Sequence, residues 1–266
     1  LFRSVCQQKN MSNYNLNPEL DERLRVSLAN PGSFMEDLSL VYAFHQFPVL
    51  APKSVFFVPI EDHKALPVFT TEEELEVFLS ELTDFETEWE LHSLIEILDQ
   101  LMETDIDILA INPKLPQDED KGNTVYFGTP ELMQFLVHYT EILNKVFSPE
   151  NLEAEQREKY YFVPAFVTTS GQRTFPNLIN QDNEEYLPLF DNLDSLAKWH
   201  NEAYFSQAFK ENNGQVLLLK IDELLNGEDE AINDLGKSLG ITVNPLDYSQ
   251  EEVQNSMVTW EELTRD

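Results

Sequence analysis

The sequence predicts an α+β protein made of two similar small mixed sheets, each with covering helices. Three observations lead to this prediction. Apolar residues recur at helical spacing in some segments and alternate or run together as in strands in others, short motifs occur twice in the same order, and prolines interrupt the strand-like runs. Hydrophobic residues make up 42% of the 266 residues and aromatic residues 11%, which is typical of a chain with one or two folded domains and too apolar for a disordered acidic one.

The first half of the chain contains a strand hairpin between helices. A capping box from Thr70 to Glu73 is expected to open the helix after the hairpin. Residues 91–102 carry apolar side chains on one helical face, and Asn112-Pro113 ends the last strand. In chain order the expected elements are a helix over 33–44, strands over 54–60 and 65–69 around a polar turn at 61–64, a helix from residue 70, a helix over 91–102 and a strand over 107–111.

The second half follows the same plan, with a longer polar insertion over 168–185 in its hairpin. Pro59, Pro67, Pro164 and Pro188 fall inside strand-like runs. Because proline donates no ladder hydrogen bond, we expect these prolines at sheet edges, strand ends or bulges. The expected elements are strands over 160–168, 174–179 and 186–190, a helix from residue 192, a strand over 216–221, a helix near 228–239, a strand over 241–243 and a last helix capped by Ser249 and Glu252.

Four pairs of short motifs keep their order along the chain, at offsets of 112, 105, 121 and 132 residues. The preferred interpretation is a duplicated unit, and the alternative is one larger α+β domain in which the matches arose by chance. The pairs are Pro18-Glu19-Leu20 with Pro130-Glu131-Leu132, Phe57-Val58-Pro59 with Phe162-Val163-Pro164, Leu66-Pro67-Val68-Phe69 with Leu187-Pro188-Leu189-Phe190, and Ile111-Asn112-Pro113 with Val243-Asn244-Pro245.

The repeat sets the expected domain boundaries. Residues 11–115 form the first unit, the polar segment 116–129 forms a linker, and residues 130–266 form the second, divergent unit. Residues 1–10 precede the first methionine, Met11, and are expected to be a disordered leader. A true N-terminus that begins at an unusual start codon is the alternative.

Charge and cysteine content exclude several classes of protein. The chain has 17 basic and 49 acidic side chains and a formal net charge of −32. Nucleic acid and anionic membranes are therefore not expected partners, because phosphate binding needs a surplus of Lys and Arg. The one cysteine excludes a disulfide framework and a cysteine-based zinc site. No apolar run approaches the roughly 20 residues of a membrane span, and no export signal is recognisable, so the cytoplasm is the expected location.

No motif for catalysis, cofactor binding or metal binding stands out. Phosphate-cradling glycine loops are absent from a chain with 8 glycines, and the five histidines are scattered singly. Cys6 lies in the expected leader, away from any electropositive pocket that would activate a thiolate. The acidic segment 118–122 lacks the spacing of a calcium loop, and the acidic cluster over 182–194 is expected to be a solvated face, with weak divalent-ion binding as the alternative. We expect no catalytic residues, no metal ligands and no cofactor.

The recurring motifs resemble the N-terminal domain of the SseB (enhanced serine sensitivity) family of bacteria. The resemblance covers about residues 18–113 and, more faintly, the second half. It implies an α+β cytoplasmic protein of poorly defined function, and it transfers no catalytic residue. The motif positions are expected to be structural and are Phe57, Val58, Pro59, Leu66, Pro67, Phe69, Asn112, Pro113, Phe162, Val163, Pro164, Leu187, Pro188, Phe190, Asn244 and Pro245.

Three functions remain open. The preferred one is a non-catalytic interaction or regulatory module, because a strongly acidic surface suits a basic protein partner. The alternative is a small-ligand binder or enzyme with its site in a cleft between the two copies. The third is a nucleic-acid mimic, which would place its acidic residues along one face, whereas here they are spread over the whole chain.

Overall fold

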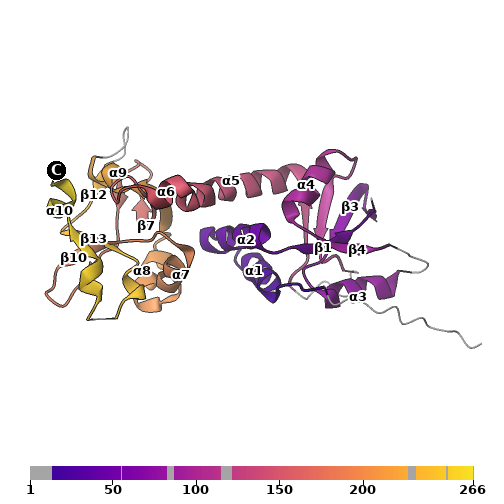
Figure 1. Cartoon of the computed structure of the whole chain (residues 1–266), viewed down its shortest axis with the longest axis horizontal. Helices are drawn as coiled ribbons and strands as arrows, with labels where there is room; N and C mark the ends of the chain where they lie inside the picture. The colour runs from indigo at the N-terminus through magenta and orange to yellow at the C-terminus, as the bar shows by residue number, and fades with distance from the viewer. Residues whose placement is uncertain are drawn as a thin grey trace, which may run out of the picture. The chain divides into compact units, whose positions relative to one another are not determined.

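The computed structural model describes residues 14–54, 56–82, 87–114, 122–226, 232–249 and 251–265 (Figure 1). The chain divides into two compact units, residues 1–137 and 138–266, and helix α5 (Thr129–Phe147) runs across the division. Both units combine helices with small mixed sheets, so the predicted α+β class is confirmed. The expected leader with its cysteine, and the linker segment before residue 122, lie outside the described residues.

Each unit alternates helices with short strands. Unit 1 contains α1 (Pro18–Ala29), α2 (Phe34–Gln46), β1 (Val49–Pro52), β2 (Val58–Ile60), β3 (His63–Val68), α3 (Glu72–Glu81), β4 (Trp89–His92), α4 (Leu94–Met102), β5 (Ile108–Ile111) and β6 (Val125–Gly128). Unit 2 contains α6 (Pro149–Glu153), β7 (Tyr160–Val167), β8 (Arg173–Thr174), β9 (Leu178–Ile179), β10 (Glu185–Leu189), α7 (Leu193–Asn201), α8 (Ala203–Glu211), β11 (Gln215–Lys220), α9 (Ile221–Asn226), β12 (Asn233–Asp234), β13 (Gly240–Val243), β14 (Met257–Thr259) and α10 (Trp260–Thr264).

The main sheet of unit 1 has the strand order β2-β3-β5-β6. The central strands β3 and β5 are parallel, with Leu66 opposite Leu109, and both edge strands are antiparallel to their neighbours. The connection between the parallel strands contains α3, β4 and α4, and β4 pairs with β1 in an antiparallel ribbon. A bridge between Leu50 and Phe69 joins this ribbon to the end of β3.

An aromatic cluster forms part of the core of unit 1. Phe69, which follows β3, is fully buried and packs with Leu50, Leu75 and Trp89. Its ring centroid lies 5.3 Å from that of Trp89, in an edge-on arrangement. Burying such a side chain contributes roughly 1.5–3 kcal/mol relative to leaving it exposed. Phe69 therefore ties the end of β3 to α3 and to the β1–β4 ribbon.

Helix α3 begins one residue later than its predicted capping box. The hydroxyl of Thr71 accepts a hydrogen bond from the backbone N–H of Glu74 at 3.2 Å. Thr70 is instead fully buried, and its hydroxyl donates to Asp21 at 2.6 Å. The predicted box of Thr70 with Glu73 is therefore wrong, because the Thr70 hydroxyl is taken by a carboxylate that is remote in the sequence.

The main sheet of unit 2 has the order β9-β10-β13-β14 and repeats the strand directions of unit 1. β10 and β13 are parallel, and both edge strands are antiparallel. β7 pairs antiparallel with β11, as β1 does with β4. A bridge from Phe162 to Phe190 joins this ribbon to the end of β10. The short strands β8 and β12 pair with each other, and β8 also pairs with β7.

The strand order changes one of the predicted motif pairs. Leu50 in β1 and Phe162 in β7 make equivalent bridges, and they stand 112 positions apart, the same offset as the two Pro-Glu-Leu motifs. The predicted match of Phe57-Val58-Pro59 with Phe162-Val163-Pro164 is wrong, because the first triplet leads into the edge strand β2 and the second lies within β7. A tripeptide of common residues carries too little information to set the register.

The strand prolines mark places where a strand changes its partner. Pro59 lies in an edge strand, as predicted. Pro67 and Pro188 lie in the central strands β3 and β10. Each follows the residues that pair with the edge strand, β2 or β9. Each also stands two residues before a phenylalanine, Phe69 or Phe190, that bridges to the ribbon. Pro164 lies between Phe162, which bridges toward β10, and the residues that pair with β8. Backbone groups two residues apart point to the same side of a strand. The N–H that each of these prolines lacks would therefore point to the side on which the strand is changing from one partner to the next, where no ladder hydrogen bond is lost.

Several predicted boundaries are wrong. The predicted helix over 91–102 begins with two residues of strand β4. The predicted linker over 116–129 includes strand β6, which pairs with β5, and the predicted helix over 228–239 contains strand β12. The predicted last helix after Ser249 is replaced by a 3-10 turn at 253–256, strand β14, and helix α10, which is capped by Thr259 with Glu262. Strands β6, β12 and β14 are only 4, 2 and 3 residues long, too short for an apolar alternation to be recognised.

Candidate functional site

In unit 1, Asn112 holds together the carboxyl ends of the two parallel strands. Its backbone is left-handed, with φ 47°, and its N–H donates to the carbonyl of Val68 at 2.8 Å. The side-chain Oδ1 accepts from the backbone N–H of Thr70 at 2.9 Å, and Nδ2 donates to the Thr70 hydroxyl at 2.8 Å. We call this arrangement the asparagine clasp.

Unit 2 contains the same asparagine clasp. Asn244 has φ 49°, and its N–H donates to the carbonyl of Leu189 at 2.9 Å. Its Oδ1 accepts from the backbone N–H of Asp191 at 3.2 Å, and its Nδ2 donates to the Asp191 carboxylate at 2.6 Å. The Asn-Pro motif therefore has a structural role in both units, and the prolines that follow it, Pro113 and Pro245, are buried.

The clasp of unit 1 continues into a buried polar network. Asn123, fully buried just before β6, donates through Nδ2 to the Asp21 carboxylate at 2.8 Å and to Glu74 at 3.0 Å. Lys114 lies 3.1 Å from the same Glu74 oxygen, and its side chain is 1% exposed. Helix α1, helix α3, the segment after β5 and the segment before β6 thus meet at one set of polar contacts.

The carboxylate of Asp21 is held in its ionised form. Burial favours the neutral acid, but hydrogen bonds from Thr70, Asn123 and Arg25, with the attraction of the Arg25 cation, outweigh it and lower the pKa of Asp21 below its usual 3.8. Arg25 Nε donates to Asp21 Oδ2 at 2.7 Å. A carboxylate with this many donors is a poor proton acceptor, so the network supports structure rather than acid–base catalysis.

Other polar groups also lack the arrangement of a reactive site. His63 Nδ1 lies 2.6 Å from Asp107 Oδ2, and this hydrogen bond raises the pKa of His63. Both side chains are more than half exposed, so they form a solvated surface pair. Within the described ranges, no group of three or more His, Cys, Asp or Glu side chains is placed to hold a metal ion. No helix in those ranges is both long and apolar enough to cross a membrane.

An apolar groove of about 280 Å³ lies between α3 and the face of the main sheet in unit 1. We call it the α3 groove. Residues that the sequence analysis expected to be structural, Val58, Pro59 and Pro113, line it together with residues that it did not single out as site residues. The full lining is Val58, Pro59, Ile60, Val77, Phe78, Glu81, Leu82, Pro113, Lys114 and Tyr126.

The two edge strands of the main sheet both contribute to the groove. Strand pairing places Pro67, Ala110 and Tyr126 side by side across β3, β5 and β6. Side chains of residues paired in this way share one face of the sheet. Val58 of the other edge strand stands opposite Ala65, two residues before Pro67, so Val58 and Tyr126 line the groove from the same face of the sheet.

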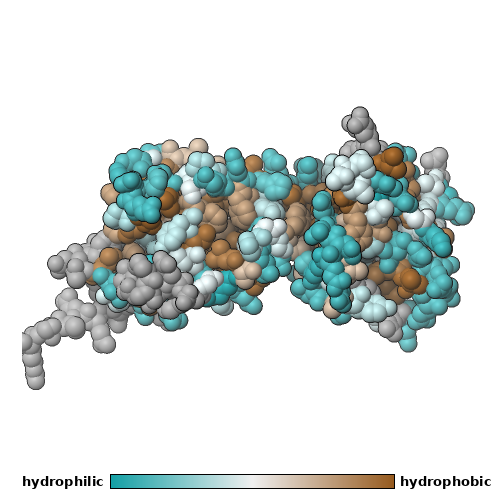
Figure 2. All heavy atoms as spheres, turned by 180° about the vertical axis from the view of Figure 1, so that it is seen from behind, coloured by the Kyte–Doolittle hydropathy of each residue, from teal (hydrophilic) through white to brown (hydrophobic). Residues whose placement is uncertain are grey.

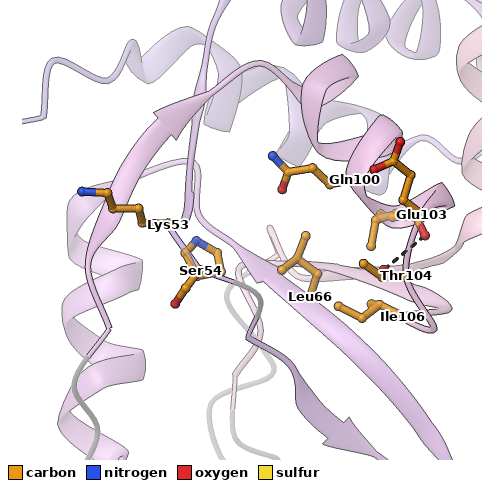
Figure 3. A pocket seen from close by; sticks show the side chains of 9 residues that line it. Lys53, Ser54, Leu66, Gln100, Glu103, Thr104 and Ile106 are labelled. Atoms are coloured by element: carbon orange, nitrogen blue, oxygen red, sulfur yellow. Dashed lines mark hydrogen bonds between the residues drawn. The ribbon is translucent and has the colours of Figure 1, made fainter.

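A second cavity, of about 320 Å³, lies in unit 1 beside the C-terminal end of α4. Figure 3 shows Leu66 and Ile106 close together in this α4 cavity, with Gln100, Glu103 and Thr104 on the α4 side. Lys53 also lines the cavity, and its ammonium is bound to Glu88 at 2.9 Å. Val58 of the α3 groove stands opposite Ala65, whereas the α4 cavity is lined by Leu66. Because successive residues of a strand face opposite sides, the two sites use opposite faces of the sheet.

The remaining motif residues belong to the core of their own unit. Phe69, Phe162, Leu187 and Phe190 are fully buried, as is Val163. Phe57 is the exception, with 42% of its surface exposed. Asp21, Asn123 and Lys114 were not predicted as site residues. Their only signal in the sequence is a polar residue beside a motif or near the start of a helix.

Comparison with known proteins identifies no family. The sequence matches no family model and no curated protein. Among solved structures the chain is similar to Tic22 from Plasmodium falciparum, with 12% identity and a TM-score of 0.19 over 75% of this chain and 91% of that chain. It is also similar to Anabaena Tic22, whose title mentions protein transport, with 12% identity and a TM-score of 0.22 over 80% of this chain and 91% of that chain. TM-scores this low support no statement about the fold or function of this chain.

Proposed function

We propose that this chain is a non-catalytic interaction module of the bacterial cytoplasm that binds a basic protein partner. The supporting observation is that most motif side chains pack in the core or are hydrogen-bonded within their own unit, while most of the described acidic residues are exposed. Asn112, Asn244 and Asp21 are each hydrogen-bonded within their own unit. On the face seen in Figure 2, hydrophilic residues cover much of each unit, and smaller hydrophobic patches are interspersed among these residues. A chain with 49 acidic and 17 basic residues, most of its described acidic residues being exposed, attracts basic proteins at low salt.

Affinity capture at two salt concentrations tests this proposal. The full chain is immobilised, incubated with host lysate and washed at about 0.05 M or about 0.5 M salt, concentrations that differ severalfold in screening length. A specific basic protein that is retained at low salt and released at high salt is expected. An unrelated protein of similar net charge is the control, because a generic polyanion captures the same basic proteins nonspecifically. Absence of any protein enriched over that control contradicts the proposal.

The α4 cavity supports a second candidate function, the binding of a small ligand. Its apolar floor and three polar side chains at the α4 side resemble the usual composition of small-molecule sites, and about 320 Å³ falls at the low end of their size range. A thermal-shift screen of small metabolites tests this function. A ligand that stabilises the chain but not the variant Gln100→Ala supports it, provided that the neighbouring exposed-site variant Asp99→Ala responds normally. A screen without any such ligand contradicts it.

We also propose that the chain is a divergent, duplicated member of the SseB family. The shared strand order of the two main sheets and the asparagine clasp in each unit support duplication. If the two units arose from one, the clasps have the same energetic role. Substituting Asn112 or Asn244 by Ala is then expected to lower the stability of the unit that carries it by a similar amount. A large loss in one unit and none in the other contradicts this proposal.

A further inference from the structure

We infer that the α3 groove binds one large apolar side chain of an extended partner segment whose flanking residues are basic, in the order basic–x–apolar–x–basic. This inference rests on the proposed function, because it names the part of the partner that the module recognises. Three features of unit 1 lead to it: the size and lining of the groove, the charge of helix α3, and the spacing of the acidic residues along that helix.

The α3 groove suits a side chain better than a whole cofactor. Its volume of about 280 Å³ lies at the small end of the range for small-molecule pockets, roughly 300–1,000 Å³, which leaves no room for a large cofactor. Val58, Ile60, Val77 and Phe78 give it an apolar lining. The cationic end of Lys114 is bound to Glu74 and so adds no unpaired charge to the inner wall. A leucine, methionine or phenylalanine side chain is the natural occupant of such a space.

Helix α3 gives the mouth of the groove a strong negative charge. Its ten residues, Glu-Glu-Glu-Leu-Glu-Val-Phe-Leu-Ser-Glu, include five glutamates and no basic residue. Glu74 belongs to the buried network, but Glu73 and Glu81 are exposed. Within the described part of the chain, neither forms an ion pair. A partner with basic side chains is therefore attracted to this helix, and an acidic partner is repelled.

Glu73 and Glu81 stand about one helical turn before and after Val77, which lines the groove. Glu73, Val77 and Glu81 are four residues apart in turn, so they form one row along the helix, and Val77 and Glu81 line the groove. With a rise of 1.5 Å per residue, the two glutamates are about 12 Å apart along the helix axis. Along this row an apolar side chain, Val77, therefore lies between two acidic side chains, Glu73 and Glu81.

An extended segment matches this spacing. Successive residues of a strand advance about 3.3 Å, and every second side chain points to the same face. Residues 1, 3 and 5 of such a segment therefore share one face and span about 13 Å. A basic residue at positions 1 and 5 reaches the two glutamates while the apolar residue at position 3 enters the groove. Moving the basic residues to positions 2 and 4 turns them away.

A peptide panel tests the inference with the full-length chain. The reference peptide is an eleven-residue Gly/Ser-rich sequence with Lys-Ser-Leu-Ser-Lys at its centre, and binding is measured by fluorescence anisotropy. Replacing the leucine by serine is expected to weaken binding about tenfold or more, since it removes a buried apolar side chain. Shifting both lysines to the neighbouring positions, or replacing them by glutamate, is expected to weaken it at least about fivefold at low salt.

Variants of helix α3 locate the binding surface without touching the core. The double variant Glu73→Gln and Glu81→Gln is expected to bind the reference peptide about fivefold more weakly at low salt, with the difference shrinking to less than about twofold near 0.5 M salt. Glu76→Gln is the matched control, because Glu76 is exposed on the same helix but lies off the row of Glu73 and Glu81. Equal binding by all three proteins overturns the inference, as does binding of the leucine peptide regardless of its charges.

The same variants separate failure of this inference from failure of the proposed function. If the double variant still captures the lysate partner as well as the unmodified chain does, the interaction module stands and the α3 groove is not its binding site. If neither protein captures a partner and no peptide binds, both proposals fail. If the chain itself occupies the groove of a second copy, sedimentation shows a dimer that the double variant disrupts, and this outcome overturns the basic-segment inference.

Discussion

At the scale of single residues, Asn112 combines a backbone role with a side-chain role. Its φ of 47° lies in the left-handed region, which costs most L-residues roughly 1–2 kcal/mol but is tolerated by asparagine. Its amide makes hydrogen bonds to both the backbone and the side chain of Thr70. Glycine would supply the backbone conformation and aspartate one of the acceptors, but neither would supply the donated bonds.

Replacing Asn112 by Ala is therefore expected to lower the free energy of unfolding by about 3 kcal/mol or more. The variant has a strained left-handed residue and leaves buried partners without hydrogen bonds. Urea denaturation measures the loss. Asn213→Gly is the control, because Asn213 is also left-handed, with φ 54°, but is exposed, so its replacement is expected to change stability little. A loss below about 1 kcal/mol for the Asn112 variant would show that the clasp is dispensable.

The ionised Asp21 predicts how acid affects stability. Its pKa is lower in the folded chain than its usual value of 3.8. The carboxylate therefore stabilises the fold above about pH 4, and this contribution is lost as the pH falls through the folded-state pKa. In Asp21→Asn this part of the pH dependence is absent. Thermal unfolding between pH 2.5 and pH 6 is expected to show a steeper acid loss in the unmodified chain, and parallel curves would contradict the assignment.

At the scale of elements, close packing between β13 and β14 depends on Gly240. A Cβ atom at this position would lie 2.0 Å from the carbonyl oxygen of Val258 and 2.7 Å from Thr259 Cα. Both contacts are with backbone, which cannot move without disturbing the pairing of the two strands. On its other side Gly240 is paired with Tyr186 of the parallel strand β10. The glycine therefore lies between two strands, and its lack of a side chain allows β14 to approach β13 closely.

Gly240→Ala is expected to destabilise the chain by about 1–3 kcal/mol, the usual range for overpacking. Gly128→Ala is the matched control. A Cβ at Gly128 would meet the carboxylate of Glu131 at 2.1 Å, but this is the exposed end of a flexible side chain, which can swing away. Chemical denaturation of the two variants compares them directly. Equal loss in both would mean that β13 and β14 adjust easily.

At the scale of the whole molecule, the formal charge of −32 acts on stability as well as on partners. Like charges repel one another in the folded chain, and salt screens this repulsion. The ion pairs between exposed side chains, such as Lys53 with Glu88, are worth little by comparison. Net repulsion is therefore expected to dominate the response of the fold to ionic strength.

The thermal midpoint is accordingly expected to rise by several degrees between about 0.02 M and 0.5 M sodium chloride. A triple variant, with Glu76, Glu153 and Glu251 changed to Gln, removes three exposed charges and is expected to show a smaller rise. Calorimetry at several salt concentrations measures both proteins. A midpoint that falls with salt would show that attractive pairs, rather than repulsion, control stability.

Much of the fold was predictable because it depends on local patterns. The Leu-Pro-x-Phe runs were predicted as strands that lead into helices, and Asn112 and Asn244 were predicted to end strands. The α3 groove was not predicted, since Val58, Phe78 and Tyr126 come from three elements that share no sequence pattern. Asp21 and Asn123 are hydrogen-bonded across 102 positions, and at that separation nothing in the local pattern of either residue indicates the other.

The sequence by itself determined the α+β class, the strand-ending asparagines and the acidity of the surface, because periodicity, turn chemistry and charge are properties of neighbouring residues or of simple sums. Only the tertiary structure decided that Phe162 and Leu50, rather than Phe162 and Phe57, make similar bridges, that strand prolines lie where partners change, and that Glu81 lines an apolar groove. These features depend on which strands pair and on which face a helix packs. Pairing and packing are settled by contacts between residues that are distant in the sequence, and short motifs do not encode such contacts.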